Sequence, residues 1–436
     1  MNNIKASIIT LGCRVNQYES DAIMQELVKN GVEICTHNDI CDIYIINTCS
    51  VTGESDRKSK QLIRRCVSKS KDAVIIVTGC FSQINPEKAL GIEGVDFVCG
   101  NNAKSMIAKK ALELYKEKKE PHMCVPDIFN CKFDVMQVGA PLTRTRAFIK
   151  IQDGCESKCA YCIIPYARGN VRSNSPENVI NEVKNIVSEG CYEVVLTGIE
   201  TAAYGKDFKN GYGLGDLLTE INKIEGLRRI RLGSLDPASI TKEFVDKIKA
   251  LDKVMPHFHI SMQSGSTKIL NLMKRKYNMD MARKNIHYLK ECIPNVMLSA
   301  DIITGFPQET DEDFLETLEF FRQERFLHIH IFPYSKREGT VAAKMSGQVA
   351  ENVKKDRLHI LEELQRDIRR DMLNGIVDKC LELEVLCEAF DGEFVSGHTA
   401  NFLEVRIPSD KKISGEFVKV KPFATDGDYI YAEIIY

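Results

Sequence analysis

The segment Cys155-Glu156-Ser157-Lys158-Cys159-Ala160-Tyr161-Cys162 decides how the rest of the chain is interpreted. It places three thiols within eight residues, directly after the apolar run 147–151. Thiolate ligands favour zinc, copper(I) or an iron-sulfur cluster. A structural zinc site needs a fourth Cys or His at short spacing, and the nearest histidines in sequence are His122 and His257. The segment therefore predicts a three-thiolate metal site with one coordination position left for an outside ligand.

The spacing C-x3-C-x2-C, with the aromatic Tyr161 before the last cysteine, resembles the radical-SAM superfamily. The resemblance implies that Cys155, Cys159 and Cys162 hold a 4Fe-4S cluster whose fourth iron binds S-adenosylmethionine. Reduction of such a cluster would cleave the bound molecule to methionine and a 5′-deoxyadenosyl radical. The simpler alternative is a set of three buried or zinc-binding cysteines, but structural cysteines have no reason to share this spacing.

The composition is that of an ordinary soluble globular protein. The chain has 436 residues, of which 44% are hydrophobic and 28% charged, enough for two to four domains. No apolar stretch approaches the roughly 20 residues of a membrane span, and residues 1–5 lack the apolar region of a signal peptide. We therefore expect a cytoplasmic protein with no membrane partner, in which the 16 cysteines are reduced thiols or metal ligands. The net charge of −2 argues against a protein that coats nucleic acid through bulk charge, although it allows local basic patches.

A strand, a cysteine and a helix follow one another three times near the N-terminus. Residues 5–10, 42–47 and 73–77 are apolar runs typical of buried strands. The cysteines that come after these runs are Cys13, Cys49 and Cys80. Because the carboxyl ends of parallel strands share one edge of a sheet, where open α/β sheets place their sites, these three thiols predict a second metal site. Cys99 also follows a strand-like run, but we expect no ligand there.

Six strand-like runs after residue 144 alternate with helical patterns, which predicts an incomplete barrel of parallel strands. The expected strands are 147–151, 192–197, 228–232, 257–261, 296–303 and 327–332, with helices near 177–189, 214–224, 241–251, 279–291 and 310–323. Active-site groups belong at the carboxyl ends of barrel strands. The candidate cofactor contacts in the loops and strand ends of this edge are Tyr161, Gly198, Glu200, Ser234, Gln263 and Asp301. Glycine and serine also mark ordinary turns, which is the alternative explanation.

The remaining segments predict a connection, a helix and a small third domain. Residues 120–143 contain three prolines and no clear periodicity, and indicate an inter-domain connection. A long helix is expected over 351–373, ended by Gly375. Residues 376–436 consist of short alternating segments and predict a small antiparallel barrel or sandwich.

Basic side chains at three places are candidate contacts for carboxylate, phosphate or RNA. Arg168 and Arg172 suit a carboxylate or phosphate, or else an ordinary surface ion pair. The helix after Cys49 has a basic face that suits phosphate, although a solvated face is the usual explanation. Its basic residues are Arg57, Lys58, Lys60, Arg64, Arg65, Lys69 and Lys71. In the third domain the candidate RNA contacts are His398, Asn401, Phe402, Arg406, Lys411, Lys412, Lys419 and Lys421, unless the domain is a mere cap with solvated lysines.

Over nearly its whole length the chain resembles the radical-SAM methylthiotransferases. The motifs LGCRVNQYES at 11–20, NTCSVT at 47–52 and TGC at 78–80 are most similar to the MtaB-type branch, which modifies N6-threonylcarbamoyladenosine at tRNA position 37. The resemblance implies an N-terminal α/β methylthiotransferase domain over 1–119, a linker over 120–143, a partial (β/α)6 radical-SAM barrel over 144–375 and an all-β TRAM domain over 376–436.

The resemblance also implies the chemistry. Cys13, Cys49 and Cys80 would hold an auxiliary 4Fe-4S cluster that carries sulfur, and S-adenosylmethionine would serve both as radical source and as methyl donor for methylthiolation at C2. The implied partners are the tRNA anticodon stem-loop and an electron donor such as flavodoxin or ferredoxin. At Glu200 the chain departs from many relatives, which have a histidine after this Thr-Gly-aliphatic run.

Three alternatives remain open from the sequence. A sister enzyme would act on isopentenyladenosine in tRNA or on an aspartate of a ribosomal protein. A non-catalytic iron-sulfur regulator would bind RNA without turnover. A zinc-stabilised scaffold would bind tRNA without any cluster.

Overall fold

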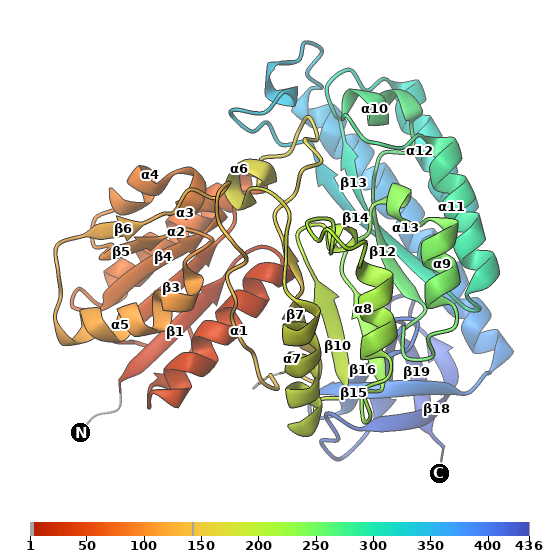
Figure 1. Ribbon diagram of the computed structural model, residues 1–436. Helices are drawn as coiled ribbons and strands as arrows, with labels where there is room; N and C mark the ends of the chain where they lie inside the picture. Colours follow the sequence, from red (N-terminus) through yellow and green to blue (C-terminus); the bar gives the residue numbers. More distant parts are fainter. Residues whose placement is uncertain (1–3, 142–143, 436) are drawn as a thin grey trace.

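The computed structural model describes residues 4–141 and 144–435, which form three successive units (Figure 1). An N-terminal parallel sheet is followed by two three-stranded parallel sheets and then by a closed C-terminal barrel. The predicted fold class, α/β with parallel sheets and a small all-β unit at the C-terminal end, is confirmed. Among the residues described, no helix combines the length and the apolar character needed to cross a bilayer.

The N-terminal unit is a six-stranded parallel sheet with the order β2-β1-β3-β4-β5-β6. Its strands are β1 (Lys5–Thr10), β2 (Glu33–Ile34), β3 (Ile43–Thr48), β4 (Val74–Gly79), β5 (Phe97–Cys99) and β6 (His122–Cys124). Its helices are α1 (Arg14–Lys29), α2 (Gly53–Lys69), α3 (Cys80–Ile84), α4 (Pro86–Leu90) and α5 (Ile107–Lys116). Strands β3 and β4 are buried at every position, as expected for central parallel strands covered on both faces.

Strand β6 lies inside the segment that the sequence assigns to the inter-domain connection. It pairs in parallel with β5, and the His122 ring packs on Phe97 at a centroid distance of 4.9 Å. A three-residue edge strand is too short to produce an alternating pattern, so the sequence does not reveal it. Residues 142–143, at the end of the expected connection, lie outside the described residues.

The central unit contains the six expected strands and the five expected helices. The strands are β7 (Ala147–Lys150), β10 (Glu193–Thr197), β11 (Arg229–Leu232), β12 (His257–Gln263), β13 (Met297–Thr304) and β14 (His328–Pro333). The helices are α7 (Pro176–Ser188), α8 (Leu214–Ile221), α9 (Lys242–Ile248), α11 (Met279–Cys292) and α12 (Asp311–Glu324). Side chains cap several of these helices, as Ser175 does for α7 and Thr310 for α12. Among the described residues a single bridge, between Leu235 and Ile260, joins the two sheets, so the barrel is incomplete.

Helix α13 (Glu351–Lys379) is longer than the sequence predicts, because it continues through Gly375 and ends at Cys380, which adopts a φ of 49°. Glycine lowers helix propensity by about 1 kcal/mol without preventing a helix. Met372, Ile376 and Val377 pack against the core of the C-terminal barrel, which holds the last turns in place. The prediction that Gly375 ends the helix is therefore wrong.

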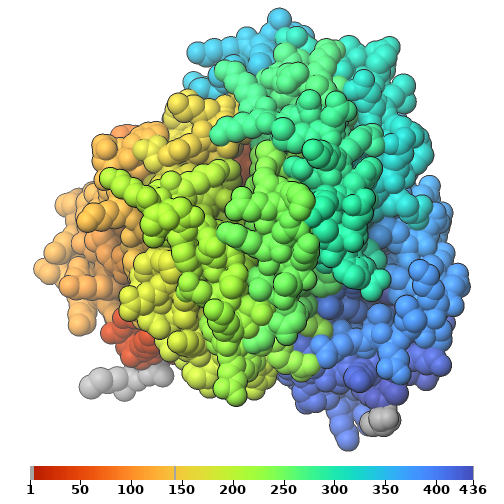
Figure 2. Space-filling view, turned by 45° about the vertical axis from the view of Figure 1, so that its right-hand side comes forward, coloured from red at the N-terminus to blue at the C-terminus, as the bar shows by residue number. Residues whose placement is uncertain are grey.

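The C-terminal unit is a closed five-stranded barrel with the order β15-β16-β17-β19-β18. Its strands are β15 (Leu383–Phe390), β16 (Phe394–Thr399), β17 (Glu404–Pro408), β18 (Phe417–Thr425) and β19 (Ile430–Ile434). In Figure 2 the residues of the central unit, in green, lie between the N-terminal residues, in orange, and the C-terminal residues, in blue. Arg231 of β11 donates to the carbonyl oxygens of Thr399 and Ala400 and so ties this barrel to the central unit.

Two of the expected RNA contacts belong to this internal interface. The Phe402 ring stacks between His257 and His398, at centroid distances of 4.6 and 4.4 Å. Arg146 and Arg231 lie over the same ring. Phe402 and His398 therefore pack against the central unit instead of facing a partner. The spacing of polar and aromatic residues along one strand region cannot distinguish these two cases.

Candidate functional site

The Cys155–Cys162 loop follows β8 (Gln152–Asp153) and precedes α6 (Ile164–Arg168). Three backbone hydrogen bonds hold it: the Cys155 N–H donates to the Gly169 carbonyl at 3.0 Å, and Ala160 both donates to Met273 at 2.9 Å and accepts from Ala342 at 2.8 Å. Lys158 has a φ of 50°, in the left-handed region that reverses the chain. The loop is therefore fixed from several sides of the barrel.

The three thiols of this loop lie near one another. Burial, together with the neighbouring Cys159 and Cys155 thiols, raises the pKa of Cys162 to about 12. Burial and the Glu200 carboxylate raise the pKa of Cys155 to about 12. Arg275 donates to the Cys159 Sγ at 3.4 Å. Three half-buried thiols that lie close together beside a cation, with no disulfide among the 16 cysteines, fit a thiolate-ligated metal group.

The structure also brings Cys13, Cys49 and Cys80 together. Burial and the nearby thiols of Cys80 and Cys13 raise the pKa of Cys49 to about 11. Gly12 has a φ of +96°, and a Cβ atom there would lie 2.9 Å from the Cys49 Sγ, so only glycine permits this approach. Cys99, which the sequence leaves out of the site, lies within β5 and donates to the Ala103 carbonyl.

The two groups of thiols are neighbours. The Asn101 side-chain amide lies 3.7 Å from the Cys80 Sγ and donates to the Ala167 carbonyl at 2.8 Å. Ala167 belongs to α6, the helix that follows the Cys162 loop directly. Burial raises the pKa of Cys13, and the charge of Arg168, the next residue after Ala167, partly offsets this rise. One short helix therefore adjoins both sites.

A buried charge network lies beside these sites. It consists of the carboxylates of Glu19 and Asp153 and the cations of Lys104, Lys150 and Arg168. Glu19 accepts from Arg168 at 2.6 Å, from Lys150 at 2.9 Å and also from Lys104. All five side chains are at most 3% exposed.

The network has three cations and two carboxylates. Its net positive charge acts on the pKa values of the nearby cysteines. Burial opposes the charge of Arg168, but Glu19, Asp153 and the Cys80 thiol raise its pKa. Burial lowers the pKa of Lys104, and the charges of Glu19 and Cys80 partly offset that effect. A positive surplus stabilises thiolates, which is what metal ligation requires. Arg168 thus forms buried ion pairs with Glu19 and Asp153. The predictions that Arg168 binds a phosphate or forms a surface ion pair are therefore wrong.

Two of the candidate cofactor contacts lie against the Cys155 loop. The Glu200 carboxylate accepts from the Cys155 Sγ and from the Ser157 hydroxyl, both at 3.1 Å. Gly198 packs on Gln152, because a Cβ atom there would lie 2.7 Å from the Gln152 side-chain oxygen.

The other candidate contacts are distributed over the barrel. Tyr161 packs edge-to-face on Phe306, with ring centroids 6.4 Å apart. The Ser234 and Ser261 hydroxyls lie 2.5 Å apart. Gln263 ends β12 with a φ of 64°, next to a register irregularity. Such strained positions persist at sites where the surrounding structure imposes them.

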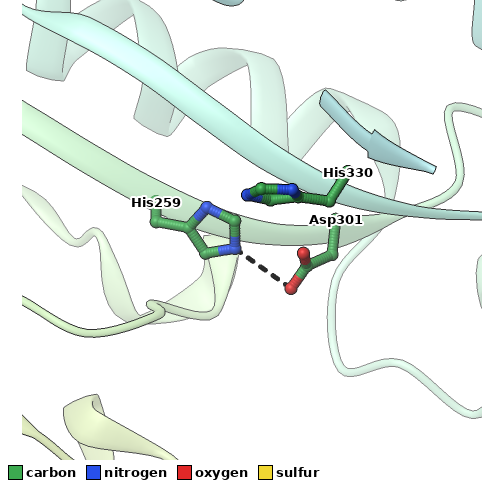
Figure 3. A group of neighbouring side chains, drawn as sticks. All are labelled: His259, Asp301 and His330. Carbon is green, nitrogen blue, oxygen red and sulfur yellow. Dashed lines mark ion pairs between the residues drawn. The ribbon is translucent and has the colours of Figure 1, made fainter. Parts of the chain in front are cut away.

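Asp301 does not lie at the strand end. It is three residues before the end of β13, and its carboxylate is 3.0 Å from the His259 Nε2, with His330 of β14 alongside (Figure 3).

Four residues of this region have roles that the sequence does not indicate. Arg275 and Gln152 hold the cysteine loop through Cys159 and through the backbone of residues 153–154. Glu19 and Lys104 pair across 85 positions of the chain. A buried ion pair at that separation leaves no local pattern, since each residue on its own resembles a surface charge.

Comparisons with known proteins agree with this geometry. Residues 5–100 match the model of the Uncharacterized protein family UPF0004, and residues 149–321 match that of the Radical SAM superfamily. The threonylcarbamoyladenosine tRNA methylthiotransferase MtaB of Bacillus subtilis (strain 168) is 40% identical over 417 residues, which are 94% of this chain and 92% of that protein. The tRNA-2-methylthio-N(6)-dimethylallyladenosine synthase of Moorella thermoacetica is 35% identical over 427 residues, 95% of this chain and 94% of that protein.

The chain belongs to the radical SAM tRNA methylthiotransferase family. Each group of thiols in this methylthiotransferase falls within one matched region, since Cys13, Cys49 and Cys80 lie in the first and the Cys155 loop in the second. The radical S-adenosylmethionine methyltransferase TsrM from Kitasatospora setae has a TM-score of 0.57 over 76% of this chain and 73% of its own, at 13% identity. At that identity the likeness concerns the fold alone.

Proposed function

We propose that the methylthiotransferase converts N6-threonylcarbamoyladenosine at position 37 of tRNA to its 2-methylthio derivative. The observation that supports this proposal most directly is the pair of adjacent three-thiol sites, which Asn101 and α6 connect. Each site has three protein donors and so leaves one position for an outside ligand. The choice of substrate rests on the 40% identity to a relative named for this nucleoside, against 35% to one named for dimethylallyladenosine.

The residues take different roles in this proposal. Cys155, Cys159 and Cys162 hold a 4Fe-4S cluster with S-adenosylmethionine, and Cys13, Cys49 and Cys80 hold the auxiliary cluster. Bound there, these groups supply a 5′-deoxyadenosyl radical, sulfur and a methyl group. The residues proposed to contact S-adenosylmethionine are Tyr161, Gly198, Glu200, Ser234 and Gln263. The Glu200 carboxylate, which Lys206 approaches at 3.4 Å, accepts from the ammonium group of the methionine end.

The partners follow from the reaction. The anticodon stem-loop must bring position 37 to the thiol sites, and a flavodoxin or ferredoxin supplies electrons from outside. The exposed basic side chains of α2 are proposed contacts for RNA phosphates, and the protein works in the cytoplasm, where tRNA and reducing conditions coincide.

The decisive experiment measures iron and acid-labile sulfide after anaerobic reconstitution of the wild type and of Cys13→Ala and Cys155→Ala. Each variant should lose about half of the iron, because the ligand groups are separate. Cys292→Ala, which changes a half-buried thiol remote from both groups in sequence, is the matched control and should keep all of it.

Activity separates the alternatives. The wild type with reductant should release 5′-deoxyadenosine and form the 2-methylthio derivative in a stem-loop that carries threonylcarbamoyladenosine. Product only on an isopentenyladenosine stem-loop would assign the protein to the sister branch. Absence of 5′-deoxyadenosine with full iron would indicate a regulator, and zinc in place of iron a scaffold.

A further inference from the structure

Three side chains of metal-binding types come together on the inner face of β12, β13 and β14. They are His259, Asp301 and His330, one from each strand (Figure 3). A direct neighbour of each in the sequence packs into the hydrophobic core with the outer helices, namely Ile260, Ala300 and Ile329. Because successive residues of a strand point to opposite faces, the three polar side chains point away from those helices.

The ligand atoms of these residues are close enough to share one ion. The His259 Nε2 lies 3.0 Å from the Asp301 carboxylate, and one nitrogen or oxygen atom from each of the three residues lies within 4.8 Å of the others. Two atoms that each bind one zinc ion at about 2.1 Å are about 3.0 to 3.5 Å apart. His259 and Asp301 already have this spacing. The exposed His330 side chain has to move by less than about 2 Å to reach it.

Each histidine also has a polar partner at its other ring nitrogen. The His259 Nδ1 lies 2.9 Å from the Ser299 hydroxyl, which in turn lies 3.2 Å from the His257 Nε2. The His330 Nδ1 lies 3.2 Å from the His328 Nε2. A histidine that binds a metal ordinarily donates a hydrogen bond from the nitrogen that does not bind it, and this bond fixes the ring. These contacts leave Nε2 of both rings for an ion.

The Asp301 carboxylate needs a cation. Among the residues described, its only ion-pair partner within 4.0 Å is His259, which is charged only when protonated. The simplest alternative to a metal is therefore a plain His259–Asp301 pair with a proton on the ring. That pair gives His330 no role, whereas a metal ion uses all three side chains.

The ligand types select the metal. Two imidazole nitrogens and one carboxylate oxygen suit zinc or another transition metal, while magnesium and calcium prefer oxygen ligands alone. Zinc bound by three protein ligands keeps a further position for water or a substrate atom. Since His330 is exposed, solvent reaches this position.

We propose that His259, Asp301 and His330 bind one Zn²⁺ ion, separate from the two groups of thiols. This site does not depend on which nucleoside is the substrate. Its free coordination position holds water.

The proposed zinc site is connected to the Cys155 loop. Ser261 follows His259 by two residues and so lies on the same face of β12. The Ser261 carbonyl accepts from Arg275 at 3.0 Å, and Arg275 also donates to the Cys159 Sγ at 3.4 Å. The strand that carries the first zinc ligand is therefore linked to the first thiol site through one arginine.

The test measures zinc binding to the full chain after anaerobic reconstitution of its clusters, by metal analysis and by competition with a coloured zinc chelator. We expect the wild type to bind one Zn²⁺ per chain in addition to its iron, with a Kd below about 1 µM. His330→Gln and Asp301→Asn should lower the zinc affinity by at least about 100-fold, and Ser299→Ala, which removes only the partner of His259, by about 10- to 100-fold. The exposed His330 is the safest position to change, and an unchanged iron content shows that each variant folds.

The matched control is His287→Gln. The His287 Nε2 also lies close to a carboxylate, at 2.8 Å from Glu324, but there Arg283 and Lys290 pair with the same carboxylate. Those two cations disfavour a metal ion, so this variant should keep the full zinc affinity.

X-ray absorption of the bound zinc identifies its ligands. Only nitrogen and oxygen neighbours, at about 2.0 to 2.2 Å, are expected. A sulfur neighbour at about 2.3 Å would place the zinc in a thiol site and overturn the proposal. A wild type that binds no zinc at about 10 µM, a His330→Gln variant that binds it as tightly as the wild type, or an equal loss in His287→Gln would overturn it as well.

Discussion

The substitution Glu19→Gln should destabilise the protein because it removes the carboxylate that pairs with the buried Lys104. Glu19 contacts three buried cations, but two of them keep a second carboxylate, because Asp153 lies 2.7 Å from Lys150 and 3.3 Å from Arg168. Lys104 keeps only the side-chain oxygen of Asn47, at 3.0 Å. The variant therefore leaves the buried charge of Lys104 without a carboxylate. Removal of one partner of a buried ion pair costs about 3 to 5 kcal/mol of stability.

Hydrogen exchange of the α1 amides is the suitable assay, since a chain with three units need not unfold in one step. Adding Lys104→Met to Glu19→Gln should restore part of the loss, about 1 to 3 kcal/mol, because no unpaired ammonium group then remains. Glu26→Gln removes an exposed carboxylate from the same helix and should change the opening free energy by less than about 0.5 kcal/mol. A Glu19→Gln variant as stable as Glu26→Gln, or a double variant worse than Glu19→Gln alone, would refute the reasoning.

Two other contacts between units give measurable effects. Burial raises the pKa of Glu182 to about 8, although Tyr18 donates a hydrogen bond to its carboxylate. The folded state therefore keeps a proton on Glu182 that the unfolded state releases above pH 4.5. Stability should fall as the pH rises from about 5 to 8. Glu182→Gln stays neutral, and its unfolding temperature relative to wild type should rise steadily over that range; parallel pH profiles would contradict this. Phe402→Ala should lower the stability of the interface with the C-terminal barrel by about 2 to 3 kcal/mol through lost stacking on His257, seen as faster proteolysis of that barrel, whereas the half-exposed Phe423→Ala should not.

The sequence predicts the main strands because each is a local pattern. Buried parallel strands are continuous apolar runs, such as 43–48 and 74–79, and turns follow them directly. The elements that it misses depend on contacts from elsewhere. Strand β6 has only three residues, and Gly375 stays helical because distant barrel residues pack on the next turn.

The same division applies to the site. The sequence predicts two groups of cysteines because strand ends and short spacings bring their members together. Glu19 and Lys104 could not, since their pairing depends on the docking of separate segments. Phe402 was misassigned because an aromatic residue among polar ones has the same pattern at an RNA surface and at a domain interface.

Helix α1 has a consequence for the engineering of this family. Two of its residues form hydrogen bonds with the central unit. Asn16 accepts from Arg168 at 2.5 Å, and Tyr18 donates to Glu182 at 3.0 Å. The N-terminal unit is thus not an interchangeable module. A chimera that joins it to the barrel of another relative should express poorly unless the grafted barrel supplies equivalents of Arg168 and Glu182, and crossover points are better placed within the barrel than at its boundary.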